Sequence, residues 1–203
     1  GDHRYLQSFP TRRSSDLHGE RVSLSYHELH RQVAGLADAL RKSGVVAGDR
    51  VAGFMPNRPE AVIGMLAATS IGAVWSSCSP DFGINGVLDR FGQIAPKVLI
   101  TTDGYYYAGK AIDCLERIRG VLEKLPSVEQ VVVVPYVNPR PEISAVPRAV
   151  HWSDYLTSAE EIRFEQLPFD HPVYIMYSSG TTGVPKCIRS EEHTSELQSR
   201  HNL

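Results

Sequence analysis

Short apolar runs recur along the chain, and longer segments with helical periodicity lie between them. The runs are RVAGFM (50–55), GAVW (72–75), KVLIT (97–101), QVVVVP (130–135) and VYIMY (173–177). The QVVVVP run shows no alternation of polar and apolar residues, which is typical of a strand inside a parallel sheet. Strands that alternate with helices indicate an α/β fold. The sequence therefore predicts a mostly parallel sheet with helices on both faces.

Four segments between these runs have helical spacing. They are the residues from Ser25 to Gly44 and the ranges 59–71, 81–94 and 110–125. Ser25 with Glu28 three residues later is typical of a helix N-cap, and Gly44 suits the position after a helix end. Pro59 suits a first helical turn. We expect Asp81 to cap the third helix.

The composition is that of an ordinary globular protein. The 203 residues suit one domain or part of a larger one, with 42% hydrophobic and 22% charged residues. A net charge of −2 gives no basic footprint for nucleic acid or an anionic membrane. No apolar run approaches the about 20 residues of a membrane-spanning helix, and no secretory signal is visible.

The cysteines give no sign of a metal centre. Cys78, Cys114 and Cys187 match no metal motif and no disulfide framework. We therefore expect a cytoplasmic protein without a metal site built from its side chains. Its expected partners are small molecules, not nucleic acid or membrane.

The two ends of the chain differ in character from the middle. FPTRRSSDL (9–17), with GDHRYLQS before it, resembles the translation of a common sequencing adapter, and RSEEHTSELQSRHNL (189–203) resembles that of the opposite adapter. Foreign tracts are set aside before a fold is argued. We expect residues 1–17 and 189–203 to be foreign tails and residues 18–188 to be part of a larger domain. The alternative is a polar, disordered tail at each end.

A string rich in hydroxyls and glycine follows the last apolar run. It reads SSGTTGVPK and extends from Ser178 to Lys186. Glycine lets the backbone bend closely around a ligand, and hydroxyl and backbone N–H groups donate to phosphate oxygens. Lys186 adds a positive charge that suits a polyphosphate. The string predicts a phosphate-binding loop, and the alternative is a flexible surface turn.

Two common phosphate loops do not fit this string. A Walker loop needs GxxxxGK, then Ser or Thr, then a helix. Here Pro185 separates Gly183 from the lysine, and the residues after Lys186 resemble the start of a strand. The GxGxxG fingerprint of dinucleotide-binding folds is absent. The loop is therefore expected to follow one strand and to precede another.

YSSGTTGVPK (177–186) resembles the phosphate-loop motif of the adenylate-forming superfamily, which includes acyl-CoA synthetases, luciferases and the adenylation domains of peptide synthetases. Residues 50–118, above all WSSCSPDFG (75–83), are similar to the acetoacetyl-CoA synthetase family. The resemblance implies the partial N-terminal domain of that fold and a ligation in two steps. ATP and a carboxylate, such as acetoacetate, give an acyl-adenylate and pyrophosphate, and the thiol of coenzyme A then displaces AMP.

The resemblance also implies which residues act. The residues that would hold the β- and γ-phosphates, with Mg²⁺ bridging them, are Ser178, Ser179, Gly180, Thr181, Thr182, Gly183 and Lys186. Lys186 and Thr181 are the candidate catalytic residues. The family's later motifs have no counterpart here, so we expect this chain to lack adenylation activity alone. The alternatives are a ligase for acetate or propionate and a non-catalytic nucleotide-binding fragment.

Other side chains have both a functional and a structural interpretation, and the structural one is favoured for each. His27 and His30 lack a third metal ligand and suit a solvated helix face. Cys78 suits a buried small hydrophobic side chain, and Trp75 suits the core. The tyrosines at 105–107 favour surface packing over base stacking because no basic groove accompanies them.

Overall fold

The structure is a computed structural model that describes residues 23–178 and 185–190. The helices of this part of the chain are α1 (Tyr26–Lys42), α2 (Pro59–Ser70), α3 (Ile84–Ile94), α4 (Leu115–Leu122) and α5 (Trp152–Tyr155). The strands of its large sheet are β1 (Arg50–Phe54), β2 (Val74–Cys78), β3 (Val98–Thr102), β6 (Gln130–Val134), β7 (Ala149–His151), β8 (Tyr174–Ser178) and β9 (Lys186–Ser190). A separate hairpin consists of β4 (Gly104–Tyr107) and β5 (Lys110–Asp113).

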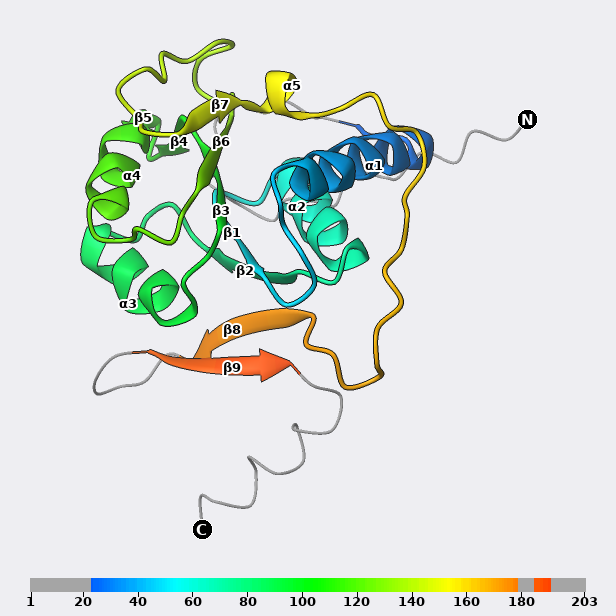
Figure 1. Cartoon of the computed structure of the whole chain (residues 1–203). Coiled ribbons are helices and arrows are strands. Elements are labelled where there is room, and N and C mark those ends of the chain that lie inside the picture. The colour runs from blue at the N-terminus through cyan, green and yellow to red at the C-terminus, as the bar shows by residue number, and fades with distance from the viewer. Residues whose placement is uncertain (1–22, 179–184, 191–203) are drawn as a thin grey trace.

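The large sheet has the strand order β7-β6-β3-β1-β2-β8-β9. All its pairings are parallel except that of β8 with β9, which is antiparallel. Helices α1 and α2 lie on one side of the sheet, and α3 and α4 lie on the other (Figure 1). The predicted α/β class, with a mostly parallel sheet and helices on both faces, is confirmed.

Successive residues of the central strands belong to two separate cores, one on each face. In β1, Val51 packs in the cluster with α1 and α2, whereas Phe54 packs in the cluster with α3 and α4. In β3, Ile100 belongs to the first cluster and Leu99 to the second. Because side chains alternate across a strand and both faces are covered, both sets of positions are apolar. This double burial explains the unbroken apolar runs in the sequence.

The ends of the first two helices follow the sequence signals. Ser25 is the N-cap of α1, and its Oγ accepts a hydrogen bond of 3.1 Å from the backbone N–H of Glu28. The Glu28 carboxylate accepts from the Arg31 guanidinium at 2.6 Å. Gly44, directly after the cap residue of the helix end, has a φ of 77°, which glycine adopts without strain. Pro59 is the first residue of α2, so these predictions are confirmed.

The helix predicted over 110–125 is wrong in its first part. Lys110–Asp113 form strand β5, and only Leu115–Leu122 form the helix α4. The β4–β5 hairpin turns at Ala108 and Gly109, which have φ values of 48° and 76°. Positive φ at both central residues is the geometry of a tight two-residue hairpin. The preceding tyrosines favour a strand, so this hairpin overrides the helical spacing.

Two further boundaries differ from the sequence prediction. Helix α3 begins at Ile84 with Gly83 as its N-cap, so the prediction that Asp81 caps this helix is wrong. Asp81 is exposed and lies before the helix. The strand predicted over 72–75 covers Val74–Cys78 instead. Its serines are compatible with burial because Ser76 donates a hydrogen bond of 2.9 Å to the carbonyl of Ile175 on β8.

A long segment without regular structure, residues 156–173, connects α5 to β8 along α1 and α2 (Figure 1). The backbone N–H of Glu165 donates to the carbonyl of Ser70 at the end of α2, at 2.9 Å. The His171 Nε2 atom lies 2.8 Å from the carbonyl oxygen of Gly72. Hydrogen bonds at several points therefore hold this segment on the helices and bring β8 to the edge of β2.

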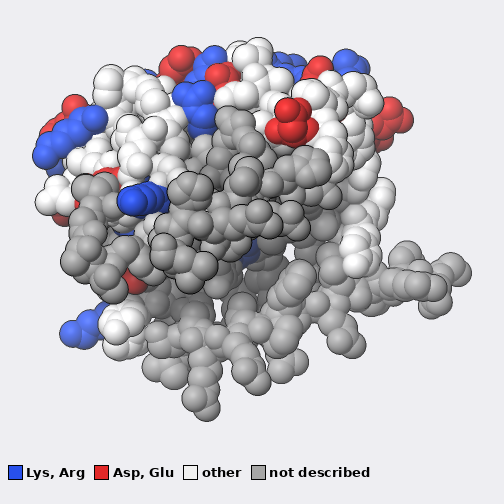
Figure 2. Space-filling view, turned by 90° about the horizontal axis from the view of Figure 1, so that it is seen from below, with Lys and Arg blue, Asp and Glu red and all other residues white. Residues whose placement is uncertain are grey.

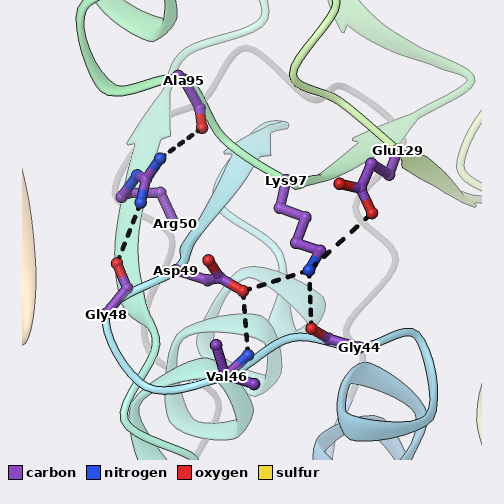
Figure 3. Close-up of polar contacts among 8 residues, drawn as sticks. All are labelled: Gly44, Val46, Gly48, Asp49, Arg50, Ala95, Lys97 and Glu129. Carbon is purple, nitrogen blue, oxygen red and sulfur yellow. Dashed lines mark hydrogen bonds and ion pairs between the residues drawn. The ribbon is translucent and has the colours of Figure 1, made fainter.

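A polar network joins several loops at the edge of the sheet where the parallel strands begin (Figure 3). The Lys97 ammonium donates to the carbonyl of Gly44 at 2.7 Å, and it lies 3.5 Å from an Asp49 carboxylate oxygen and 3.9 Å from a Glu129 one. Arg50 donates to the carbonyl of Ala95 at the end of α3, at 2.9 Å. Both cations therefore bind chain carbonyls, so this edge has a structural role.

Replacing Lys97 by methionine is expected to lower the free energy of unfolding by about 1–2 kcal/mol. The Lys97 side chain is only 25% exposed, so its hydrogen bond and ion pair are partly shielded from water. Lys42→Met is the matched control because Lys42 is 67% exposed in its ion pair with Asp38, and we expect a change below about 0.5 kcal/mol. Urea titration of both variants measures the difference, and equal losses would contradict the prediction.

Candidate phosphate-binding site

The two ends of the hydroxyl- and glycine-rich string meet at the end of the β8–β9 hairpin. Ser178 ends β8 and is registered opposite Lys186, the first residue of β9. The Ser178 hydroxyl donates to the carbonyl of Lys186 at 3.4 Å. Because β8 is parallel to β2, Ser178 and Lys186 lie at the carboxyl edge of the sheet, where open α/β folds bind ligands. The expectation that one strand precedes the loop and another follows it is confirmed.

The structure describes two of the seven predicted phosphate-binding residues, Ser178 and Lys186. Ser178 is half-buried, and Lys186 is exposed at the start of β9. Ser179, Gly180, Thr181, Thr182 and Gly183 lie outside the described residues. The phosphate contacts assigned to all seven residues, and the catalytic roles of Thr181 and Lys186, therefore stay predictions.

Two serines of the WSSC segment hold β8 in place through their hydroxyls. Ser76 Oγ makes a hydrogen bond of 3.0 Å with the Tyr177 hydroxyl, besides its bond to the carbonyl of Ile175. Ser77 Oγ makes one of 2.7 Å with the Tyr174 hydroxyl. Burial raises the pKa of Tyr177 well above its usual value, so its hydroxyl remains neutral. The sequence analysis missed these contacts, although two serines within an apolar strand are a signal that they have partners.

Asp103 is a second group that the sequence analysis missed. It directly follows β3 and is only 3% exposed. Its carboxylate accepts hydrogen bonds from the backbone N–H groups of Tyr136, Val137 and Asn138 at 2.7, 3.0 and 2.8 Å. Consecutive N–H groups around a carboxylate form an anion nest that a side chain of the same protein fills. Asp103 thus fixes the course of the chain after β6 and has a structural role.

Two of the remaining candidates, Trp75 and Cys78, adopt the structural roles that were favoured. Trp75 is 2% exposed and Cys78 is 6% exposed, so both belong to the core. Burial raises the pKa of Cys78 to about 12. His27 and His30 are exposed on α1, and the described residues contain no group of three or more His, Cys, Asp or Glu side chains that could hold a metal ion. The tyrosines at 105–107 lie in the β4–β5 hairpin, with Tyr107 63% exposed.

The charges on the surface are mixed. Figure 2 shows one face, on which the described acidic and basic side chains are interspersed along the rim. None of the helices formed by the described residues has the length and apolar character needed to span a lipid bilayer.

Fold and loop together define the class of protein. A mostly parallel α/β sheet in which a Ser/Thr/Gly-rich string ending in a lysine connects β8 to the edge strand β9 is the arrangement expected for an adenylate-forming enzyme. The sequence profile of the family described as AMP-binding enzyme matches residues 3–192. The chain belongs to this family. The matched range includes residues 3–17 and 189–192. The assignment of residues 1–17 and 189–203 as foreign tails therefore stays a prediction.

Three similar proteins are each named as an acetoacetyl-CoA synthetase. Acetoacetyl-CoA synthetase of Mus musculus is 52% identical over 176 residues, which are 83% of this chain and 26% of the mouse protein. Acetoacetyl-coenzyme A synthetase of Rhizobium meliloti (strain 1021) is 51% identical over 168 residues. Acetoacetyl-CoA synthetase from Streptomyces lividans is similar in structure, with a TM-score of 0.79 and 43% identity over 85% of this chain and 26% of that one. The chain spans about a quarter of the length of these relatives.

Proposed function

We propose that this chain is the part of an ATP-dependent acetoacetate–CoA ligase that holds the β- and γ-phosphates of ATP. The observation that carries the proposal is the pairing of Ser178 with Lys186 across the β8–β9 hairpin. This pairing places the two ends of the SSGTTGVPK string at the carboxyl edge of the sheet. The identity of 52% to an acetoacetyl-CoA synthetase supports acetoacetate as the acid.

In the proposed reaction, the main obstacle is charge repulsion. An acetoacetate oxygen forms a bond to the α-phosphorus of ATP, and the bond to the pyrophosphate oxygen breaks, which gives acetoacetyl-adenylate. The thiol of coenzyme A then attacks the acyl carbon and AMP leaves. Both attacking and leaving groups carry negative charge, so catalysis depends on positioning and on compensating cations. The Lys186 ammonium supplies one such cation, and Thr181 supplies a hydroxyl donor.

The remaining loop groups are assigned to the same polyphosphate. The hydroxyls of Ser178, Ser179 and Thr182 and the backbone around Gly180 and Gly183 donate to phosphate oxygens in this proposal. Mg²⁺, where bound, neutralises charge on the phosphates. It usually retains several waters and binds through substrate phosphates, which fits described residues that offer no carboxylate cage. We place the protein in the cytoplasm, with ATP, coenzyme A and a short acid as its partners.

Replacing Lys186 by alanine is expected to weaken ATP binding to this chain by about tenfold. Loss of one charge-assisted contact to a phosphate corresponds to about 1.5 kcal/mol. Isothermal titration calorimetry at low salt measures the affinity. Lys42→Ala is the control because Lys42 is exposed on α1, away from the β8–β9 hairpin. Equal affinities of wild type and Lys186→Ala for ATP would contradict the assignment.

The acid is tested separately from the phosphate site. Pyrophosphate release by the complete ligase is compared with acetoacetate, acetate and propionate as substrates. We expect acetoacetate to give the highest kcat/KM. A clear preference for acetate or propionate would replace the proposed substrate and leave the phosphate site unaffected.

A further inference from the structure

Two polar side chains of α3, Arg90 and Gln93, reach the β8–β9 hairpin from the same helix face, because residues three apart are neighbours on a helix. The Gln93 amide uses both of its ends. Its Nε2 donates to the carbonyl of Pro185 at 2.7 Å, and its Oε1 accepts from the Cys187 thiol at 3.3 Å. Gln93 therefore contacts the residue directly before Lys186 and the residue directly after it. Figure 1 shows α3 next to the loop end of this hairpin.

Arg90 contacts the other strand of the hairpin. Its guanidinium lies 3.9 Å from the centre of the Phe82 ring and 5.9 Å from the centre of the Tyr177 ring. It also donates to the carbonyl of Gly86 in its own helix at 2.8 Å, which fixes its orientation. A guanidinium at this distance is attracted to an aromatic face. Arg90 and Gln93 together therefore contact the last residues of β8 and the first residues of β9.

The position of these contacts matters because the backbone ladder between β2 and β8 supports the hairpin only at the end away from the loop. Strand β2 pairs with β8 at two positions, Trp75 with Tyr174 and Ser76 with Ile175. By contrast, β1 pairs with β2 at five positions. The residues from Met176 to Ser178 thus extend beyond the ladder with β2, and their backbone pairs with β9. At the loop end, the hydrogen bond between the Ser76 and Tyr177 hydroxyls and the contacts from α3 support the hairpin.

We propose that Arg90 and Gln93 form a face of α3 that fixes the backbone of Lys186 relative to Ser178 and so positions the two ends of the phosphate-binding string. This inference rests on the proposed function. Both residues are positioning residues, since they act through the hairpin and are not assigned a contact with the nucleotide. A loop that is held in its binding geometry loses less conformational freedom on binding, so affinity depends on the support.

The test compares Gln93→Met with Gln130→Met in the 203-residue chain. Gln130 is a matched control, because its Nε2 also donates to a backbone carbonyl at 2.7 Å, that of Arg148. Gln130 lies on β6, away from the β8–β9 hairpin. The probe is pyrophosphate, with its affinity measured by calorimetry. We expect Gln93→Met to bind it about three- to tenfold more weakly and Gln130→Met to bind it as wild type does. Urea midpoints should be equal for the two variants.

A second measurement reports on the hairpin without any ligand. Cys187 is exposed, whereas Cys78 and Cys114 are buried, and burial raises the pKa of each buried thiol to about 12. A thiol reagent therefore reacts with Cys187 in the folded chain. Partial burial raises the pKa of this thiol, and its hydrogen bond to the Gln93 oxygen is a further contact that must break before a reagent can attack the sulfur. We expect Gln93→Met to increase the labelling rate about threefold, and Gln130→Met to leave it unchanged.

The outcomes separate this inference from the function on which it rests. Weaker pyrophosphate binding and faster labelling in Gln93→Met, with Gln130→Met unchanged in both, support the positioning role. Wild-type affinity in Gln93→Met, or an unchanged labelling rate, overturns the positioning role and leaves the phosphate site standing. If the wild-type chain shows no pyrophosphate binding, the proposed function fails, and the positioning role fails with it.

Discussion

Replacing Trp75 by alanine is expected to lower the free energy of unfolding by about 3–5 kcal/mol, the usual range for truncating a large buried aromatic side chain. Trp75 is 2% exposed and is the largest of the fully buried side chains in the described residues. Two glycines leave the space for its ring. A Cβ on Gly53 would lie 2.6 Å from Cζ2 of the indole, and one on Gly64 would lie 2.8 Å from Cη2. The ring therefore joins β1, β2 and α2.

A double-mutant cycle tests this packing directly. Gly64→Ala alone should cost about 1–3 kcal/mol, because its methyl group meets the indole ring. In a Trp75→Leu background, the same change should cost clearly less, since the smaller side chain leaves room. Urea unfolding followed by circular dichroism gives the four free energies. Equal costs of Gly64→Ala in both backgrounds would show that the indole does not limit the space at this position.

Much of the sheet follows from local sequence because its strands are buried on both faces. The strand with Val51 and the strand with Ile100 were predicted from apolar runs alone, and their packing in two cores explains why. The β4–β5 hairpin was not predicted. Ala111 has the spacing of the helical stripe that contains Leu115, yet Ala108 before it adopts a φ of 48°. A non-glycine residue with positive φ is set by its surroundings, and local periodicity gives no sign of it.

The sequence predicted the phosphate-binding string of the candidate site but not the contacts that support it. The string from Ser178 to Lys186 indicates a phosphate loop, because glycines, hydroxyls and a lysine have a joint chemical use. The support of this loop is not visible in the string. The contact of Gln93 with Pro185 joins residues 92 positions apart, and it depends on how α3 lies against the hairpin. Such contacts arise from the fold, and an exposed glutamine in a helix gives no sequence signal for them.

Replacing Asp103 by alanine is expected to lower the free energy of unfolding by about 2–4 kcal/mol. The substitution removes the acceptor of three consecutive backbone N–H groups, those of Tyr136, Val137 and Asn138. A hydrogen bond to a charged group contributes about 1.5–3 kcal/mol. The carboxylate also accepts from the Asn138 side-chain amide at 3.0 Å. The total loss is smaller than the sum of four such bonds, because the half-buried Tyr136 and Val137 and the exposed Asn138 lie where water can reach. Asp103→Asn, which keeps one acceptor oxygen, should lose less.

Asp113→Ala provides the matched control for Asp103→Ala. Asp113 is exposed, and its carboxylate accepts a single hydrogen bond of 3.0 Å, from the backbone N–H of Glu116 in α4. Removing one such contact at a helix start costs about 0.5–1 kcal/mol. Urea titration at neutral pH ranks the three variants. Equal losses for Asp103→Ala and Asp113→Ala would mean that water replaces the buried carboxylate, and that the chain after β6 keeps its course without it.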